Sequence, residues 1–226
     1  MISLNNPLSG LTGVDQKIIK TLSKIMKLGI EGYGVFSSAE AIGRRYLDDP
    51  ELKTKEDKVD ALIKNELHKN FASGFLTSFG GIITLPATIP ASLVANWIIQ
   101  TRMSAAIAHV VGFNLAETNV RLAVSVCLLG KSGKSILNSD IRSIQSTLRS
   151  NTISKSTRNS LLLLNQAVAT RLMRLSAARG FSRFSKAVPI VGGIIGGTLD
   201  YRSCLETAEF AKEMFLNSPT QNQDET

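Results

Sequence analysis

Few side chains in this sequence have the type and spacing that catalysis or metal binding requires. His68 and His109 are the only histidines, and neither belongs to an H-E-x-x-H sequence or to a comparable ligand spacing. Cys127 lies in an apolar run, whereas a reactive thiol needs an electropositive and partly exposed site. Asp200 and Glu206 miss the three- or four-residue spacing that brings two side chains together on a helix. The sequence therefore predicts no catalytic residue, no metal and no cofactor.

One stretch, residues 124–135, is superficially similar to a phosphate-binding loop. Such a loop needs G-x-x-x-x-G-K-[ST], because that length wraps backbone N–H groups around the phosphates. Here Gly130 lies only three residues before Gly133, and Leu128 stands where the first glycine is required. Nucleotide binding is therefore not predicted.

The chemistry that stands out is apolar. Residues 70–101 contain no formal charge, and Gly80, Gly81, Pro86 and Pro90 interrupt this stretch. An unbroken helix of about 20 apolar residues would cross a bilayer. A proline inside a helix, however, removes a hydrogen bond and clashes with the preceding turn. We therefore expect two short helices joined by an extended tip over residues 80–90, and no simple transmembrane helix.

A second apolar segment, residues 187–199, contains glycines at positions 192, 193, 196 and 197. Glycines four residues apart let two helix backbones approach closely, which occurs in lipid and in soluble cores alike. Each glycine also costs about 1 kcal/mol of helix propensity relative to alanine, so four in one segment need a packing reason. We predict that the two apolar segments pack together through Gly80, Gly81, Gly192, Gly193, Gly196 and Gly197.

Two interpretations of this pair stay open. Both segments are tight crossings inside a soluble helical core, or the tip enters the lipid interface with Trp97 near the headgroups. In the first interpretation Trp97 is an ordinary core residue.

The net charge of +8 is concentrated in one part of the chain. Residues 131–186 hold eleven basic side chains against Asp140 alone, which predicts contact with an anionic surface. Phe181 and Phe184 are the only aromatic residues among these charges, and no nucleic-acid-binding motif is present, so an anionic membrane is favoured over nucleic acid. A merely solvated surface is the plainer alternative. The predicted lipid contacts are Leu85, Pro86, Ile89, Pro90, Trp97, Arg171, Arg174, Arg179, Arg183 and Lys186.

Helical periodicity dominates the rest of the chain, and nothing predicts a substantial sheet. A first helix is expected from Val14 to near Gly32. Capping boxes at Ser37-x-x-Glu40 and Thr54-x-x-Asp57 open the next two. Further helices are predicted over residues 91–112, 118–129 (capped by Thr118 or Asn119), 139–148 and 161–179, and a last one follows the second glycine segment. We expect a compact all-α domain over residues 14–216, an N-terminal arm over 1–13 and a disordered polar tail over 217–226.

Cysteine usage and the N-terminal residues bear on localisation. Cys127 and Cys204 each lie in an apolar helical pattern, which predicts buried thiols in a reducing compartment. Residues 1–11 lack a basic start followed by an apolar core, so no signal peptide is predicted. We expect a cytoplasmic protein, peripheral to the inner membrane.

Several of these motifs together resemble the EcsC family. They are Ser73-Gly-Phe-Leu-Thr-Ser-Phe-Gly-Gly-Ile-Ile-Thr-Leu-Pro86, Ile89-Pro90, Gln100-x-Arg102, Ala105-Ala-Ile-Ala-His109-x-x-Gly112 and Lys186-Ala-Val-Pro-Ile-Val-Gly-Gly-Ile-Ile-Gly-Gly-Thr-Leu-Asp200. The resemblance covers most of residues 30–216. Residues 131–160 match poorly, so the lipid interpretation of their charge gains no support from it. The family is bacterial, is named for a protein encoded beside an ABC transporter and has no assigned chemistry. The resemblance thus implies a fold and a membrane context.

The sequence as a whole favours a non-catalytic protein that associates with an anionic membrane. It would serve as an accessory of a membrane machine, with a membrane protein as a further partner, or act on the bilayer itself. One alternative is a soluble protein–protein interaction module that keeps the apolar hairpin buried. Others are a membrane-disrupting effector or toxin and an unrecognised hydrolase.

Overall fold

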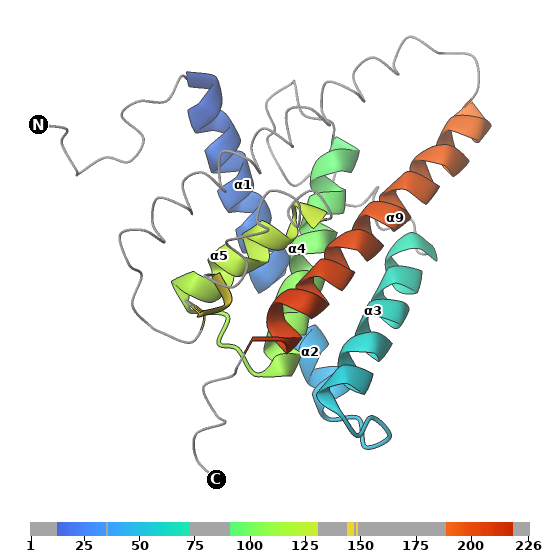
Figure 1. The fold of residues 1–226 in the computed structure, drawn as a ribbon. Helices are drawn as coiled ribbons and strands as arrows, with labels where there is room; N and C mark the ends of the chain where they lie inside the picture. Colours follow the sequence, from blue (N-terminus) through green and yellow to red (C-terminus); the bar gives the residue numbers. More distant parts are fainter. Residues whose placement is uncertain are drawn as a thin grey trace, which may run out of the picture.

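The computed structural model describes residues 13–34, 36–72, 91–130, 144–146, 148 and 189–218, without the side chains of residues 13–19, 69–72, 91–92 and 189–200. Six helices account for most of the regular structure in these ranges (Figure 1), and residues 144–146 and 148 are helical as well. A bridge between Tyr33 and Phe36 is the only extended pairing found there. The prediction of an all-α fold is therefore confirmed. The helices are α1 (Gly13–Glu31), α2 (Ala39–Leu47), α3 (Lys55–Ala72), α4 (Ala91–Val111), α5 (Thr118–Cys127) and α9 (Pro189–Leu216).

Two glycines end helices where the sequence predicts an end. Gly32 follows α1 with φ +76°, and Gly112 follows α4 with φ +112°, a region that side chains with a Cβ avoid. At the end of α4, the Gly112 N–H donates to His109 O (3.0 Å) and the Phe113 N–H donates to Ala108 O (3.0 Å). This pair of bonds is a Schellman motif, which satisfies carbonyls that the helix itself leaves without partners.

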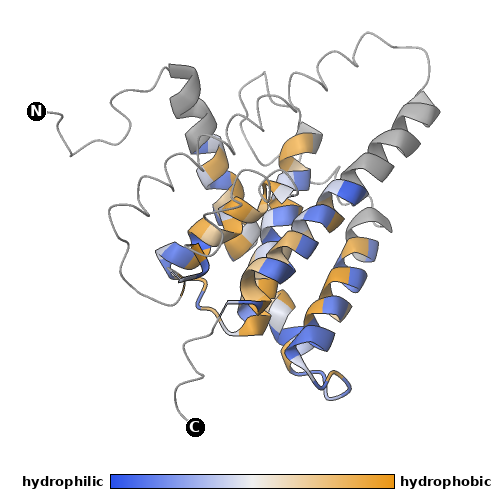
Figure 2. Cartoon of the chain, in the orientation of Figure 1, coloured by the Kyte–Doolittle hydropathy of each residue, from blue (hydrophilic) through white to orange (hydrophobic). Residues whose placement is uncertain are grey.

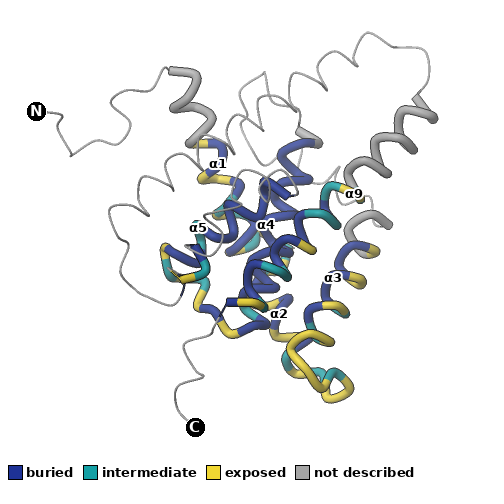
Figure 3. The backbone as a smooth tube through the Cα atoms, in the orientation of Figure 1, coloured by how far each residue is buried: buried dark blue, intermediate teal, exposed yellow. Residues whose placement is uncertain are grey.

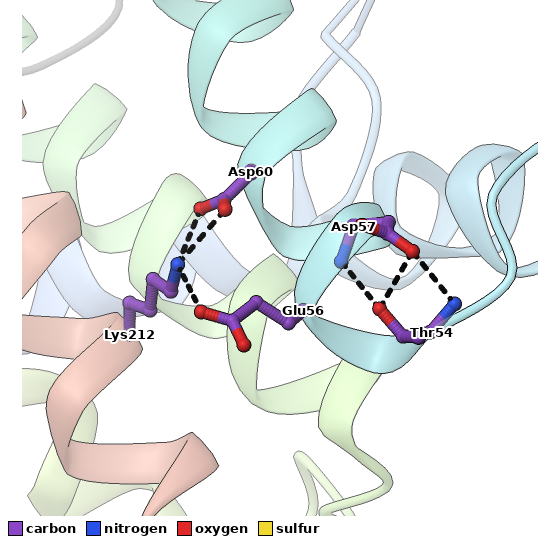
Figure 4. Close-up of polar contacts among 5 residues, drawn as sticks. All are labelled: Thr54, Glu56, Asp57, Asp60 and Lys212. Atoms are coloured by element: carbon purple, nitrogen blue, oxygen red, sulfur yellow. Dashed lines mark hydrogen bonds and ion pairs between the residues drawn. The ribbon is translucent and has the colours of Figure 1, made fainter.

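The predicted start of α3 is confirmed in detail. The Thr54 N–H donates to Asp57 Oδ2 and the Asp57 N–H donates to Thr54 Oγ1, both at 3.0 Å (Figure 4). The Thr54 hydroxyl also donates to Asp57 Oδ2 (2.7 Å). This bond and the one from the Thr54 N–H stabilise the ionised carboxylate, so they lower the pKa of Asp57.

The starts of α2 and α5 differ from prediction. Ser38, not Ser37, caps α2 by accepting from the Ala41 N–H (3.1 Å), and the Ser37 hydroxyl accepts from Arg45 Nη2 (3.2 Å) instead. Helix α5 begins at Thr118 behind Glu117, whose side chain makes no capping bond. Ser37 and Ser38 are of the same type and both suit an N-cap, so the sequence alone does not decide between them.

Helix α4 runs through the centre of the bundle. Every residue from Leu93 to Ala108 is buried, and α1, α2, α3, α5 and α9 all pack against this helix (Figure 3). The buried residues around it are mostly apolar, although the charged Glu66 and Arg102 are buried as well. Figure 2 shows the chain coloured by hydropathy, with hydrophobic and hydrophilic residues alternating along the helices. Burial on all sides explains why this part of the long uncharged stretch lacks charges: an unpaired charge there would be costly. Its apolarity is a property of a core helix.

The second glycine segment is itself helical. The sequence predicts a last helix after this segment, whereas α9 runs without a break from Pro189 to Leu216. Glycine lowers helix propensity without preventing helical hydrogen bonds, and proline suits the first helical position because its missing N–H is not needed there. Elsewhere, Ile144 and Leu148 of the predicted 139–148 helix are buried. The predicted helix over 161–179 lies outside the described residues.

Candidate functional site

A seam of polar side chains joins α4 to α9 inside the core. Cys204 Sγ donates to Asn96 Oδ1 (2.8 Å) and Thr207 Oγ1 donates to Gln100 Oε1 (3.2 Å). Gln100 Nε2 also donates to Ser203 Oγ (3.0 Å). Residue numbers rise together along the two helices, so α4 and α9 run parallel. Buried polar groups tolerate few arrangements, because a shift of one turn would leave several of them unpaired. The seam therefore fixes the register of α9.

Helix α3 is tied to α9 by one lysine between two carboxylates. Lys212 Nζ donates to Asp60 Oδ1 (2.7 Å) and lies 2.9 Å from Glu56 Oε1 (Figure 4). Burial alone would lower the pKa of Lys212, but the hydrogen bonds to Asp60 and Glu56 outweigh it and raise that pKa. The start of α3 thus meets the end of α9, and the two helices run antiparallel.

These contacts bring several chain ends to one end of the bundle. Helix α3 ends at Ala72, where α4 begins at Ala91 and α9 begins at Pro189 (Figure 1). Helix α1 runs in the same direction as α4, and its first residue, Gly13, lies at that end too (Figure 1). We call this the junction end. At the opposite end, the loop end, Lys55 Nζ of α3 donates to Val111 O at the end of α4 (2.8 Å).

The structure describes some of the predicted site residues, and others lie outside the described ranges. Trp97 of α4 is only 1% exposed, so its predicted contact with headgroups is wrong: the helices packed around α4 make it a core residue, the other interpretation of the sequence. Gly192, Gly193, Gly196 and Gly197 lie in the first turns of α9, at the junction end. The remaining predicted residues lie outside the described residues, so their packing and lipid contacts stay predictions: Gly80, Gly81, Leu85, Pro86, Ile89, Pro90, Arg171, Arg174, Arg179, Arg183 and Lys186.

A buried charged cluster joins α2, α3 and α4. Tyr46 Oη donates to Glu66 Oε1 (3.3 Å), and Glu66 and Arg102 are 5% and 4% exposed. Burial lowers the pKa of Arg102 to about 10 although the Glu66 carboxylate acts to raise it. Burial, together with the Glu66 charge, raises the pKa of Tyr46 to about 12. This cluster is not recognisable in the sequence, because Glu66 lies among exposed polar residues of α3 and only packing distinguishes it from them.

Substituting Tyr46 by phenylalanine tests the cluster through its pH dependence. Loss of the hydrogen bond to Glu66 is expected to lower the free energy of unfolding by about 1–2 kcal/mol at pH 8. The folded protein raises the pKa of Tyr46 from 10.0 to about 12, so the unfolded chain ionises first as pH rises. The contribution of Tyr46 to the free energy of unfolding is therefore lost as pH rises from 10.0 to about 12. The difference in this free energy between the wild type and Tyr46→Phe should become smaller over the same range. Urea unfolding of both proteins at pH 8 and at pH 11 measures this difference. A difference that is larger at pH 11 would contradict the raised pKa of Tyr46.

The comparisons with known proteins agree with the motifs in the sequence. The profile of the EcsC protein family matches residues 12–216, a range that includes every helix described above. The chain belongs to the EcsC family. No curated protein and no solved structure matches it significantly.

The described surface of this EcsC chain bears on membrane contact. None of its described helices is both long enough and apolar enough to span a bilayer. Tyr33, 55% exposed, is the one large hydrophobic side chain that stands out from the surface of the described ranges.

The EcsC chain also has a cleft at its loop end, with a volume of about 720 Å³. His109 lines it, and burial lowers the pKa of this histidine. The imidazole packs against Gly43 of α2, where an added Cβ would lie 2.8 Å from His109 Cδ2.

Cys127 is fully buried, and burial raises the pKa of its thiol. Among the described residues, no three His, Cys, Asp or Glu side chains are grouped so as to hold a metal ion. His109 and Cys127 thus have the surroundings of packing residues.

Proposed function

We propose that this EcsC-family protein docks reversibly on an anionic membrane, at the cytoplasmic face of the inner membrane, through its junction end and without catalysing a reaction. One observation carries the proposal: α3 ends and α4 begins at the same end of the bundle, so the uncharged segment 73–90 leaves and re-enters there. The start of α9 brings the chain back from the basic segment 131–186 at that same end.

The apolar part of the contact is assigned to residues 73–90. Core burial accounts for the uncharged residues of α4, and the uncharged residues 73–90 come directly before that helix. Proline and glycine favour a tip that lies shallowly in the interface, where water and headgroups satisfy backbone groups that hydrocarbon would leave unpaired. Leu85 and Ile89 supply the hydrophobic contact, each contributing about 1.5–3 kcal/mol if fully buried.

The electrostatic part is assigned to the basic segment. Lys186 lies three residues before the start of α9, so the chain connects it directly to the junction end. Each basic group near an anionic bilayer contributes about 1 kcal/mol, and salt screens this attraction. Arg171, Arg174, Arg179 and Arg183 belong to the same segment. The apolar segment and the end of the basic segment both connect to helices at the junction end, which favours membrane contact over a merely solvated surface.

Flotation of the full-length protein with vesicles tests the proposal. Vesicles rich in phosphatidylglycerol should carry the wild type at low salt, whereas purely phosphatidylcholine vesicles should carry much less, and added salt should weaken binding. Leu85→Asp should reduce the partition coefficient about ten-fold or more, because the hydrophobic contact of this leucine is lost.

Ala41→Asp is the matched control, since Ala41 is exposed in α2 near the loop end and the substitution adds the same charge. It should bind as the wild type does. A folded wild type that stays unbound on anionic vesicles at low salt would refute the proposal and favour the soluble interaction module. Release of an entrapped dye upon binding would favour a membrane-disrupting effector instead.

A further inference from the structure

One face of α1 carries a row of exposed lysines. Lys20, Lys24 and Lys27 are all exposed, and their spacing of four and three residues places them on one side of the helix. The opposite side packs into the core through residues such as Leu22 and Ile25. The row is therefore a solvent-facing basic surface of an otherwise well-packed helix.

Charge changes sign along this surface, from the junction end toward the loop end. Lys20 lies nearest the junction end, and the row ends at Glu31, which lies 4.0 Å from Lys27 and 3.5 Å from Arg121. The loop end continues the trend, because residues 40–60 hold seven acidic and five basic side chains. The described bundle is thus more positive toward the junction end and more negative toward the loop end.

An anionic bilayer would orient such a molecule. It attracts the positive end and repels the negative one, which favours an upright position with the junction end against the headgroups. A position lying on the side of the bundle would bring the acidic loop end close to the same anionic surface. The charge distribution therefore selects the end-on orientation by a route that does not use the apolar segment.

We infer that the protein stands end-on on an anionic phospholipid surface and that Lys20, Lys24 and Lys27 contribute to binding in decreasing order. This inference rests on the proposed function and adds the orientation of the bound molecule. Lys27 follows Lys20 by seven positions, so the two lysines lie about 10 Å apart along the helix. This distance is close to the Debye length of about 8–10 Å at 0.10–0.15 M salt. An upright helix would thus place Lys27 one screening length farther from the membrane.

Single neutralising substitutions test the order. In flotation with phosphatidylglycerol-rich vesicles at 0.1 M salt, as for the wild type, Lys20→Gln should lower the partition coefficient about five-fold, which corresponds to about 1 kcal/mol. Lys24→Gln should have a smaller effect and Lys27→Gln one below about two-fold. Lys53→Gln is the matched control: Lys53 is exposed at the loop end and donates to Pro50 O (2.8 Å), and its loss should leave partition unchanged. These exposed substitutions are expected to change stability by at most about 0.5 kcal/mol.

The outcomes separate this inference from the proposed function. If the wild type binds and the losses fall from Lys20 to Lys27, the end-on orientation is supported. Equal losses at the three positions would mean a side-on orientation and overturn it, and wild-type binding with no loss at any position would overturn it as well. If these lysines govern retention of a DNA duplex while vesicle binding is unchanged, the surface serves nucleic acid and the inference fails. Absence of wild-type binding would refute the proposed function, and the inference with it.

Discussion

Glu66→Gln is expected to lower the free energy of unfolding by about 3–5 kcal/mol, because it leaves the buried Arg102 cation without the opposite charge of this carboxylate. Both side chains are at most 5% exposed, so water cannot replace the lost interaction. Glutamine keeps the size of the side chain and an oxygen that accepts from Tyr46, which confines the change to charge. Urea unfolding followed by circular dichroism should show a lower midpoint at an unchanged slope.

Glu56→Gln provides the matched control on the same helix. The Glu56 side chain is 67% exposed and shares Lys212 with Asp60, so neutralising it should cost at most about 1 kcal/mol. Adding Arg102→Met to Glu66→Gln should restore much of the lost stability, because the buried charge is then gone as well. Equal effects of the Glu66 and Glu56 substitutions would contradict a dominant role for the buried pair.

Gly29→Ala is expected to cost about 2 kcal/mol, although alanine is the better helix former by about 1 kcal/mol. An added Cβ would lie 2.6 Å from both Cβ and Cγ2 of Thr101 and 3.0 Å from Ile98 O. Threonine is branched at Cβ and has little rotamer freedom, and the carbonyl belongs to the central helix. Neither can move aside, so α1 and α4 would have to separate. Thermal and urea unfolding would measure the loss.

Gly43→Ala offers a graded comparison at the crossing of α2 and α4. Its added Cβ would meet His109 Cδ2 at 2.8 Å and Ala106 O at 3.2 Å, and an imidazole rotates more readily than a helix shifts. We expect a cost of about 1 kcal/mol, smaller than at Gly29. Ser23→Ala, on the exposed side of α1, should change stability by at most about 0.5 kcal/mol. A Gly29→Ala variant as stable as Ser23→Ala would show that the helices do not cross as closely as described.

Local signals predicted the helices well. Gly32 and Gly112 end α1 and α4 because only glycine adopts their positive φ without strain. The Thr54–Asp57 pair opens α3 because its hydrogen bonds lie within one helical turn. In each case the deciding interaction spans a few residues. The N-cap of α2 is an exception: the sequence predicts Ser37, but Ser38 caps the helix. Local signals do not distinguish two neighbouring serines that both suit the position.

Signals that depend on distant residues were ambiguous. An uncharged run such as the one that includes Trp97 suits a lipid environment and a protein core equally well. In the structure, five helices pack around its second half, which is therefore part of the core. Among the described residues, close helix crossings lie at Gly29 and Gly43, which no glycine repeat marks. A polar row on α4, Asn96 and Gln100 four residues apart, is the one signal of the α4–α9 seam that the sequence offers.

The sequence by itself determined the all-α class, most helix ends, the EcsC motifs and the placement of the excess charge in residues 131–186, because composition, periodicity and capping act over a few neighbouring residues. Tertiary structure alone decided which apolar residues form the core, that Glu66 and Arg102 are buried, and that the ends of α3, α4 and α9 meet at one end of the bundle. Burial and direction depend on which helices pack side by side, and contacts between residues about a hundred positions apart, such as Asn96 and Cys204, settle that packing.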